Sequence, residues 1–371
     1  MGIVPRSREG FTLDFVARSL ASTVLHPVLT SVLAIIARSD LPALGPVAEK
    51  IASFFPHYRL ALYLTAGTGL AVWGNNILNK WSNNNWLRDP TWDFNKEIVL
   101  VTGGSGGIGA SIISHLLAKN ITTTIVVIDY VPLNWTPPDG SRVHYYQCDL
   151  SNADEVRDVS ARIKSQVGHP TVLINNAGLM RGNTLLEGSY EDTSLTIRTN
   201  LTAPFLLVKE FLPDMVANNH GHIVNVGSMS AVVAWPRLAD YAATKAGLAA
   251  LSEALRYELK MTYGAPRVRV SIARFSFVRT AMVQGEVGMN HFLFPFQHVD
   301  SVGERLADVV ASGYAENVYL PGTMRYVTSI VSGGPEWLQQ FLIGRSARKA
   351  TVVLKSTNRQ EIEPKTGFLA K

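Results

Sequence analysis

The sequence predicts an α/β fold: a doubly wound, mostly parallel sheet of about seven strands, covered by helices on both faces and preceded by hydrophobic helices. Two observations predict the sheet. From residue 96 onward, short β-branched and apolar runs alternate with amphipathic helical patterns. A glycine-rich turn also separates the first apolar run from the first helical pattern. Such alternation is typical of parallel strands joined by crossover helices.

The apolar runs place the strands at 97–101, 124–128, 143–147, 171–174, 222–226, 268–273 and 317–320. Helical stripes fall between them, for example Val156, Val159 and Ile163, and a long helical region covers 190–218. In folds of this kind, ligands bind outside the carboxyl ends of the strands. Candidate site residues are therefore expected directly after each strand.

Composition narrows the class of protein. Of the 371 residues, 47% are hydrophobic and only 17% charged, so some apolar surface is expected to face something other than water. The net charge is +5, but no basic run is interleaved with aromatic residues, and nucleic-acid binding is not expected. A single cysteine, Cys148, fits a reducing compartment and a packing role. No His/Cys cluster has metal-ligand spacing, so no metal is expected.

Residues 1–82 are predicted to be a hydrophobic membrane-anchor region. The segments 19–37 and 60–79 carry no formal charge, and a helix of ~20 residues spans a bilayer core of ~30 Å. The first segment is interrupted by His26 and Pro27, which makes the second the better candidate. Tryptophans near its end are typical of an interfacial belt: Trp73, Trp81 and Trp86. Buried or interfacial helices are the alternative.

The rest of the chain divides by composition. Residues 83–95 are rich in turn formers and are interpreted as a linker, and 96–322 as the dinucleotide-binding and catalytic domain. Residues 323–344 form an apolar or amphipathic extension, predicted to be either a membrane-surface patch or an oligomer contact, including a homodimer contact. Residues 345–371 are interpreted as a basic, poorly ordered tail.

The glycine-rich turn after the first strand is a candidate phosphate-binding loop. Glycines let the backbone approach a pyrophosphate, and the helix that starts there offers free N–H groups to the anion. A tight turn is the alternative interpretation. The cofactor-binding candidates in this loop are Gly103, Ser105, Gly107, Ile108 and Gly109.

Asp129 stands at the end of the second predicted strand, 20 residues after Gly109. A carboxylate there accepts hydrogen bonds from ribose hydroxyls and repels a 2′-phosphate, so NAD(H) is favoured and NADP(H) remains possible. A turn-capping role is the alternative. Asp149 and Leu150, after the third strand, are expected near the adenine, although a helix-capping Asp149 has the same sequence pattern.

Tyr241 and Lys245 lie four residues apart, which places them on one helix face. The ordinary tyrosine pKa is about 10, and a neighbouring ammonium group is expected to lower it. The pair is therefore a candidate general acid/base. An exposed polar helix face is the alternative.

Other polar residues follow strands in the same order. Ser228 comes directly after the fifth strand and could hold a substrate oxygen. Asn176, Ala177 and Gly178 follow the fourth strand and could flank the cofactor, or simply form a turn. Asn200, in the long helix, could hold a proton-relay water, or lie on the helix surface.

With these motifs the sequence resembles the classical short-chain dehydrogenase/reductase family over about residues 96–321. The matching elements are Thr102-Gly103-x-x-x-Gly107-x-Gly109, Asn175-Asn176-Ala177-Gly178, Asn200, Ser228 and Tyr241-x-x-x-Lys245. The resemblance implies a Rossmann-like sheet, a nicotinamide cofactor and an Asn–Ser–Tyr–Lys tetrad in which Lys245 also binds the nicotinamide ribose. Val278 and Thr280 match the positions that contact the carboxamide, and Phe275-Ser276 replaces the family's Pro-Gly.

Within the family, the chain looks most similar to membrane-associated retinol and 17β-hydroxysteroid dehydrogenases. Residues 282–297 occupy the position of a substrate lid and are rich in Met and Phe, which together with Trp235 indicates a lipophilic small-molecule substrate. Packing on the core is the alternative. The expected location is the membrane of the endoplasmic reticulum or a lipid droplet, with the catalytic domain facing the cytosol. A non-catalytic lipid-surface scaffold and a nucleotide-sugar epimerase or dehydratase are the competing functions.

Overall fold

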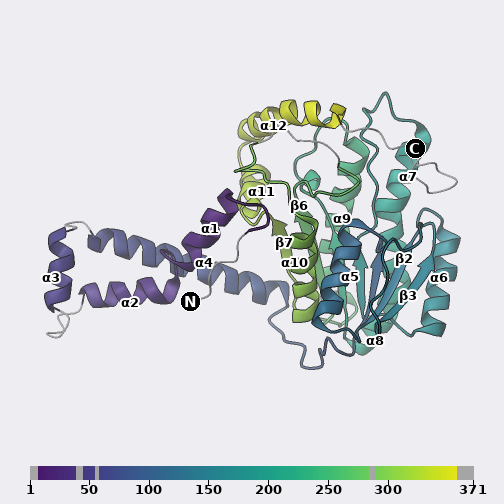
Figure 1. Cartoon of the computed structure of the whole chain (residues 1–371), viewed down its shortest axis with the longest axis horizontal. Helices are drawn as coiled ribbons and strands as arrows, with labels where there is room; N and C mark the ends of the chain where they lie inside the picture. Colours follow the sequence, from purple (N-terminus) through teal and green to yellow (C-terminus); the bar gives the residue numbers. More distant parts are fainter. Residues whose placement is uncertain (1–6, 39–44, 55–57, 284–289, 357–371) are drawn as a thin grey trace. The chain divides into compact units, whose positions relative to one another are not determined.

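The computed structural model describes residues 7–38, 45–54, 58–283 and 290–356 (Figure 1). The chain divides into two compact units, Met1–Ser82 and Asn83–Lys371. The second unit contains the sheet and every candidate site residue, so the two units are described separately.

A seven-stranded, fully parallel sheet in the order β3-β2-β1-β4-β5-β6-β7 forms the centre of the second unit. This confirms the predicted doubly wound fold. The sheet order reverses direction between β1 and β4, and in such folds the crevice above this switch point binds the ligand. The strands are β1 Ile98–Thr102, β2 Thr124–Asp129, β3 Arg142–Gln147, β4 Val172–Asn175, β5 His222–Val226, β6 Arg269–Phe275 and β7 Asn317–Leu320.

Helices cover both faces of the sheet because successive strand residues point to opposite sides. Val99 and Val101 pack against α5 and α10, which lie side by side on one face (Figure 1). Leu100, from the same strand, packs on the other face against α6, α8 and α9. The bounds are α5 Gly107–Lys119, α6 Ala153–Gln166, α7 Tyr190–Ile197, α8 Ala203–Asn218, α9 Ala239–Tyr257 and α10 Val299–Ser312.

The segment predicted as a linker is fixed to the catalytic unit. The buried Asn84 amide donates to the Ala315 carbonyl at 3.1 Å and accepts from the Ala315 N–H at 2.8 Å. The buried Arg269 guanidinium donates to the carbonyls of Asn84 and Leu87. Asp89 pairs with His220 at 2.9 Å. Residue composition showed turn formers here but not the distant groups that bind them.

The N-terminal unit contains α1 Leu13–Ser22, α2 Pro27–Arg38, α3 Gly45–Phe54 and most of α4 Tyr58–Asn83. Among the residues that the structure describes, no single helix is long and apolar enough to cross a membrane. The segment 60–79, predicted as the better span, lies in α4 and does not qualify. Leu13–Ser22 and Pro27–Ile35 are long and apolar enough only when taken together, as a pair bent by 46°. The break between them lies next to His26 and Pro27, where the sequence predicted an interruption.

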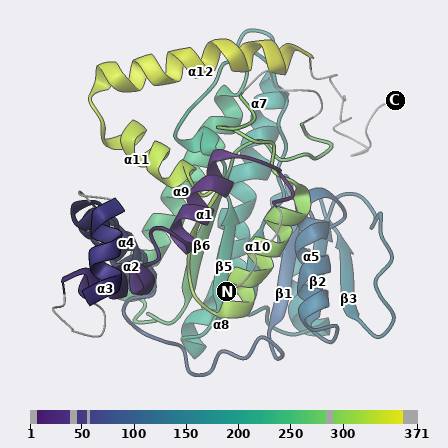
Figure 2. The ribbon, with the colours of Figure 1, turned by 60° about the vertical axis from the view of Figure 1, so that its left-hand side comes forward.

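Two helices follow the sheet: α11 Met324–Gly333 and α12 Glu336–Ser356 (Figure 2). Helix α12 continues well past Arg345, where the sequence suggested that a poorly ordered tail begins. The remainder of the expected tail, 357–371, lies outside the described residues.

Candidate active site

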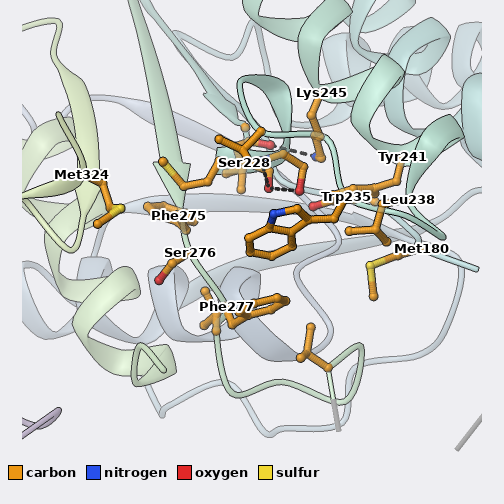
Figure 3. A pocket seen from close by; sticks show the side chains of 18 of the residues that line it. Met180, Ser228, Trp235, Leu238, Tyr241, Lys245, Phe275, Ser276, Phe277 and Met324 are labelled. Carbon is orange, nitrogen blue, oxygen red and sulfur yellow. Dashed lines mark hydrogen bonds between the residues drawn. The ribbon is translucent and has the colours of Figure 1, made fainter. Parts of the chain in front are cut away.

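A cavity of about 240 Å³ lies at the carboxyl ends of the central strands (Figure 3). It collects predicted site residues from segments far apart in the sequence. After β4 come Asn176 and Gly178, and after β5 comes Ser228. The other predicted residues that line it are Ile108, Tyr241, Lys245, Val278 and Thr280.

Ser228 and Tyr241 meet at the inner wall of this cavity. Ser228 ends the extended chain after β5 and caps a short 3₁₀ helix, Met229–Ala231, by accepting from the Ser230 N–H at 3.1 Å. Its hydroxyl donates to the Ser230 hydroxyl at 3.2 Å and lies near enough to the Tyr241 phenol to influence the pKa of that group. Burial raises the pKa of Tyr241, and the neighbouring Ser228 hydroxyl opposes that rise. The two side chains therefore line the same cavity.

Lys245 lies one turn further along α9, with its Nζ 5.6 Å from the centre of the Tyr241 ring. The ammonium group is almost fully buried and donates to the Val226 carbonyl at 2.9 Å. Burial lowers the pKa of Lys245 to about 8. In the protein alone burial dominates the pKa of Tyr241, so the lowering that the sequence predicted from Lys245 is not the net effect.

Asn200 is completely buried, which excludes the helix-surface alternative. It lies in a π-helical turn, Arg198–Thr202, between α7 and α8; such turns are frequent at functional sites. Its amide accepts from the Leu179 N–H at 2.8 Å and donates to the Leu179 carbonyl at 2.8 Å. Asn200 thus fixes the start of the loop after β4, next to Gly178 and Lys245.

The glycine turn fits a pyrophosphate. Gly103 and Gly107 have positive φ angles of 66° and 53°. A Cβ at Gly109 would lie 2.1 Å from the Gly103 carbonyl oxygen, so only glycine permits this close turn. A Cβ on Gly107 would have only the Thr280 methyl within 4 Å, at 3.7 Å, which leaves open space above the start of α5.

The residues after β4 brace this turn from the side. The Asn176 amide donates to the carbonyls of Thr102 and Gly103 at 2.9 and 3.1 Å. The Ala177 N–H donates to the Thr102 hydroxyl at 3.0 Å. Asn176 and Ala177 therefore shape the cofactor loop as well as flank the cavity.

Asp129 faces the same turn from the end of β2. Its carboxylate accepts from the Ser105 N–H at 2.8 Å and from the Val131 N–H at 3.3 Å. The Ser105 hydroxyl donates to the Val131 carbonyl, and the Trp135 indole donates to the Gly104 carbonyl. A negative charge is thereby fixed beside the expected position of the adenosine ribose.

The residues after β3, Asp149 and Leu150, make contacts within the protein. Asp149 accepts from the Ser151 N–H at 2.8 Å, and Asn152, not Asp149, caps α6. The Leu150 side chain is 8% exposed and belongs to the core under α6. Cys148 is buried too, and burial raises the pKa of its thiol to about 12, in keeping with a packing role.

Apolar side chains form most of the remaining cavity wall. Trp235 stacks on Phe277 with ring centres 5.1 Å apart, and Phe277 contacts Phe296 at 5.6 Å. The sequence predicted Trp235 and the segment 282–297. Of these, Trp235, Met282, Val283 and Phe294 line the cavity, while Met289 lies outside the described residues. The sequence interpretation missed other lining residues, namely Met180, Val233, Leu238, Met324, Val327, Val331 and Ile343. The spacing of Met324, Val327 and Val331 is a helical stripe and was the available signal.

The fold and the site together define a nicotinamide-dependent oxidoreductase. The sequence model of the family described as short chain dehydrogenase matches residues 97–290, and the chain belongs to this family. It is 38% identical over 215 residues to Dehydrogenase RED2 of Cochliobolus heterostrophus, covering 58% of this chain and 79% of that protein. It is 30% identical to Epidermal retinol dehydrogenase 2 of Mus musculus, covering 60% and 73% respectively. A solved metagenomic short-chain oxidoreductase in complex with NADP is 26% identical, with a TM-score of 0.50 over 61% of this chain and 96% of that one.

Proposed function

We propose that this protein interconverts a hydroxyl and a carbonyl group on a lipophilic small molecule, with Tyr241 as the general acid/base. The observation that carries the proposal is the cavity: Ser228 and Tyr241 meet at one wall, and aromatic and aliphatic side chains form most of the rest. A retinoid, a steroid or a similarly apolar secondary metabolite fits this chemistry. A charged or sugar-like substrate would leave its polar groups without partners against that wall.

The roles of the side chains follow from their positions. The Ser228 hydroxyl holds the substrate oxygen, and the Tyr241 phenol donates a proton to a carbonyl or accepts one from an alcohol. A bound nicotinamide cofactor supplies or accepts the hydride. Lys245, beside Tyr241, binds the cofactor ribose and stabilises the phenolate, and Asn200 orders the loop next to it.

The test is Tyr241→Phe, assayed in detergent against retinoids, steroids and aliphatic alcohols and ketones. We expect turnover to fall by about 10²-fold or more, since the proton donor is removed, while NADH binding followed by fluorescence persists. Tyr190→Phe is the matched control, because the Tyr190 side chain is almost fully exposed. Full activity of Tyr241→Phe would refute the mechanism.

We further propose that NAD(H) is preferred over NADP(H). The support is the Asp129 carboxylate, held at the glycine turn where it would repel a 2′-phosphate. Asp129→Ser should lower the ratio of kcat/KM for NAD to that for NADP by roughly tenfold or more, because a like-charge contact is removed. Asp139→Ser, in the exposed part of the same connection, is the control. A wild-type preference for NADP would refute this proposal; the solved relative named above is a complex with NADP.

We also propose that α11 and α12 contact the cytosolic surface of the endoplasmic reticulum or a lipid droplet. Large apolar side chains are exposed on these helices, and the exposed Arg345 suits an anionic headgroup. The apolar side chains are Tyr326, Ile330, Trp337 and Phe341. The same helices line the cavity on their other side, through Met324, Val331 and Ile343. A lipophilic substrate could then enter from the bilayer.

Flotation of the full chain with anionic liposomes tests this contact. Trp337→Glu/Phe341→Glu should reduce the floating fraction, whereas Ile121→Glu, exposed at the opposite end of the sheet, should not. If the double variant floats like the wild type but changes from dimer to monomer, the face is a homodimer contact instead. Imaging of the tagged chain in cells distinguishes the two organelles.

A further inference from the structure

Arg237 has a backbone conformation that a side chain other than glycine rarely adopts. Its φ angle is 70°, in the left-handed region, two residues before α9 begins. Its neighbours Trp235 and Leu238 both line the substrate cavity, and Tyr241 follows one helical turn later. Strained backbone of this kind persists only where surrounding contacts hold it.

The Arg237 side chain supplies such contacts. It is 8% exposed, and its Nε donates to the Gly182 carbonyl at 2.8 Å. Its two terminal nitrogens reach the Glu187 carboxylate, at 2.6 and 3.5 Å. The Thr184 N–H and Arg237 both lower the pKa of Glu187, so the carboxylate is charged at neutral pH. A planar guanidinium that binds a carbonyl and a carboxylate together fixes both in position.

Gly182 and Glu187 belong to the loop between β4 and α7, which is the other wall of the cavity. Near the start of this loop, Asn176, Gly178 and Met180 line the cavity. Its near end is fixed by the paired hydrogen bonds between Asn200 and Leu179. Further along, Arg181 pairs with Asp192 of α7 at 3.1 Å, and Arg237 binds the loop to the segment before α9. A buried guanidinium thus joins the two cavity walls.

We infer that Arg237 and Glu187 form a clamp that sets the width of the substrate cavity by tying the β4–α7 loop to the segment before α9. Arg237 is a positioning residue: it holds Trp235 and Met180 against the substrate and contacts neither substrate nor cofactor. The inference rests on the proposed function, because the group that the clamp positions is the proposed lipophilic substrate. Opening the clamp loosens the fit to the substrate and leaves the proton-transfer groups in place.

The main variant is Arg237→Gly, which removes the guanidinium and accepts the positive φ angle without strain. The second variant is Glu187→Gln, which keeps the size of the side chain and removes its charge. We expect KM for the best lipophilic substrate to rise on the order of tenfold in either variant, with kcat and the Kd for NADH within about twofold. KM of the double variant should equal that of either single variant, because each substitution removes the same interaction.

The matched control is the exposed ion pair, at 2.6 Å, between Glu191 on α7 and Arg198 in the π-helical turn that follows α7. Arg198→Gln should leave KM unchanged, because exposed pairs contribute little. An unchanged KM in both Arg237→Gly and Glu187→Gln would overturn the clamp, as would an equal loss of kcat for every substrate.

Amide hydrogen exchange provides a measurement independent of turnover. In Arg237→Gly, exchange should accelerate both in 179–188 and in 229–238, although only one of these segments carries the substitution. If the wild type turns over no alcohol or ketone but exchange in both segments still accelerates, the proposed function fails and the clamp stands. Acceleration confined to 229–238 overturns the clamp whatever the activity.

Discussion

Lys245 shows at the residue scale how the catalytic role that we propose for it opposes stability. Its ammonium group is buried, binds one carbonyl oxygen, and has its pKa lowered from 10.5 to about 8. Burial therefore disfavours the charged form that is needed beside a phenolate. Groups held in this way are typical of active sites, where the cost in stability is offset by the rest of the fold.

We predict that Lys245→Met stabilises the cofactor-free protein while abolishing most activity. Because the folded pKa lies below the unfolded one, the wild-type free energy of unfolding should rise between about pH 8 and pH 10.5, on the order of 3 kcal/mol in total. The variant should lack this rise and be more stable than the wild type at pH 7.

Urea denaturation at pH 7 and pH 10 provides the measurement, with turnover assayed in parallel. An identical pH dependence in wild type and variant would show that Lys245 is not desolvated in the folded protein. If Lys245→Met kept activity close to that of the wild type, Lys245 would have no catalytic role.

At the scale of elements, the segment between α4 and β1 shows how much a loop can contribute to a sheet protein. The side chain of Arg269, the first residue of β6, donates to two carbonyls of this segment. His220 lies between Asp89 of the segment and the buried Glu97, and pairs with both. Contacts with the two carboxylates raise the pKa of His220, despite its burial. This end of the sheet is opposite the cavity, so its contacts support the fold and not the chemistry.

Asn84→Ala should therefore destabilise the protein without changing its catalysis. The substitution leaves the buried N–H and carbonyl of Ala315 without partners, at a cost of about 2 kcal/mol in the free energy of unfolding. The midpoint of urea denaturation should fall, and KM should stay constant. The exposed Asn218→Ala is the control. A change below about 0.5 kcal/mol would contradict the anchoring role.

At the scale of the whole molecule, the cavity-lining residues that the structure describes all belong to one of the two compact units. Every cavity-lining residue lies between Ile108 and Ile343, within the unit Asn83–Lys371. The N-terminal unit contributes no residue to the described cavity, so cofactor binding and turnover should not depend on it.

The chain shortened to residues 83–371 is accordingly expected to fold and to bind NADH with a Kd within about threefold of the full chain's, because the glycine turn and its supports remain intact. Fluorescence titration and circular dichroism test this. Liposome flotation of the same fragment then measures how much membrane affinity α11 and α12 retain. Loss of NADH binding in a folded fragment would show that the N-terminal unit completes the site.

The sequence alone predicted the strands and their order of appearance, because buried parallel strands are short apolar runs that local composition reveals. The bounds of β5 and β7 agree with prediction, and the other strands shift by one or two residues, where hydrogen bonding rather than hydropathy decides the ends. The sequence also indicated where Ser228, Tyr241 and Lys245 would lie, since Ser228 directly follows a strand and the other two are four residues apart on one helix.

Only the tertiary structure decided what depends on contacts between distant segments. The Arg237–Glu187 pair joins residues 50 positions apart, and Asn84 reaches Ala315 across 231 positions, so no local pattern reveals either. The pKa of Tyr241 likewise follows from burial and from Ser228, not from its spacing to Lys245. Local periodicity predicts which face of an element is buried, but only the tertiary fold determines which residues pack against that face.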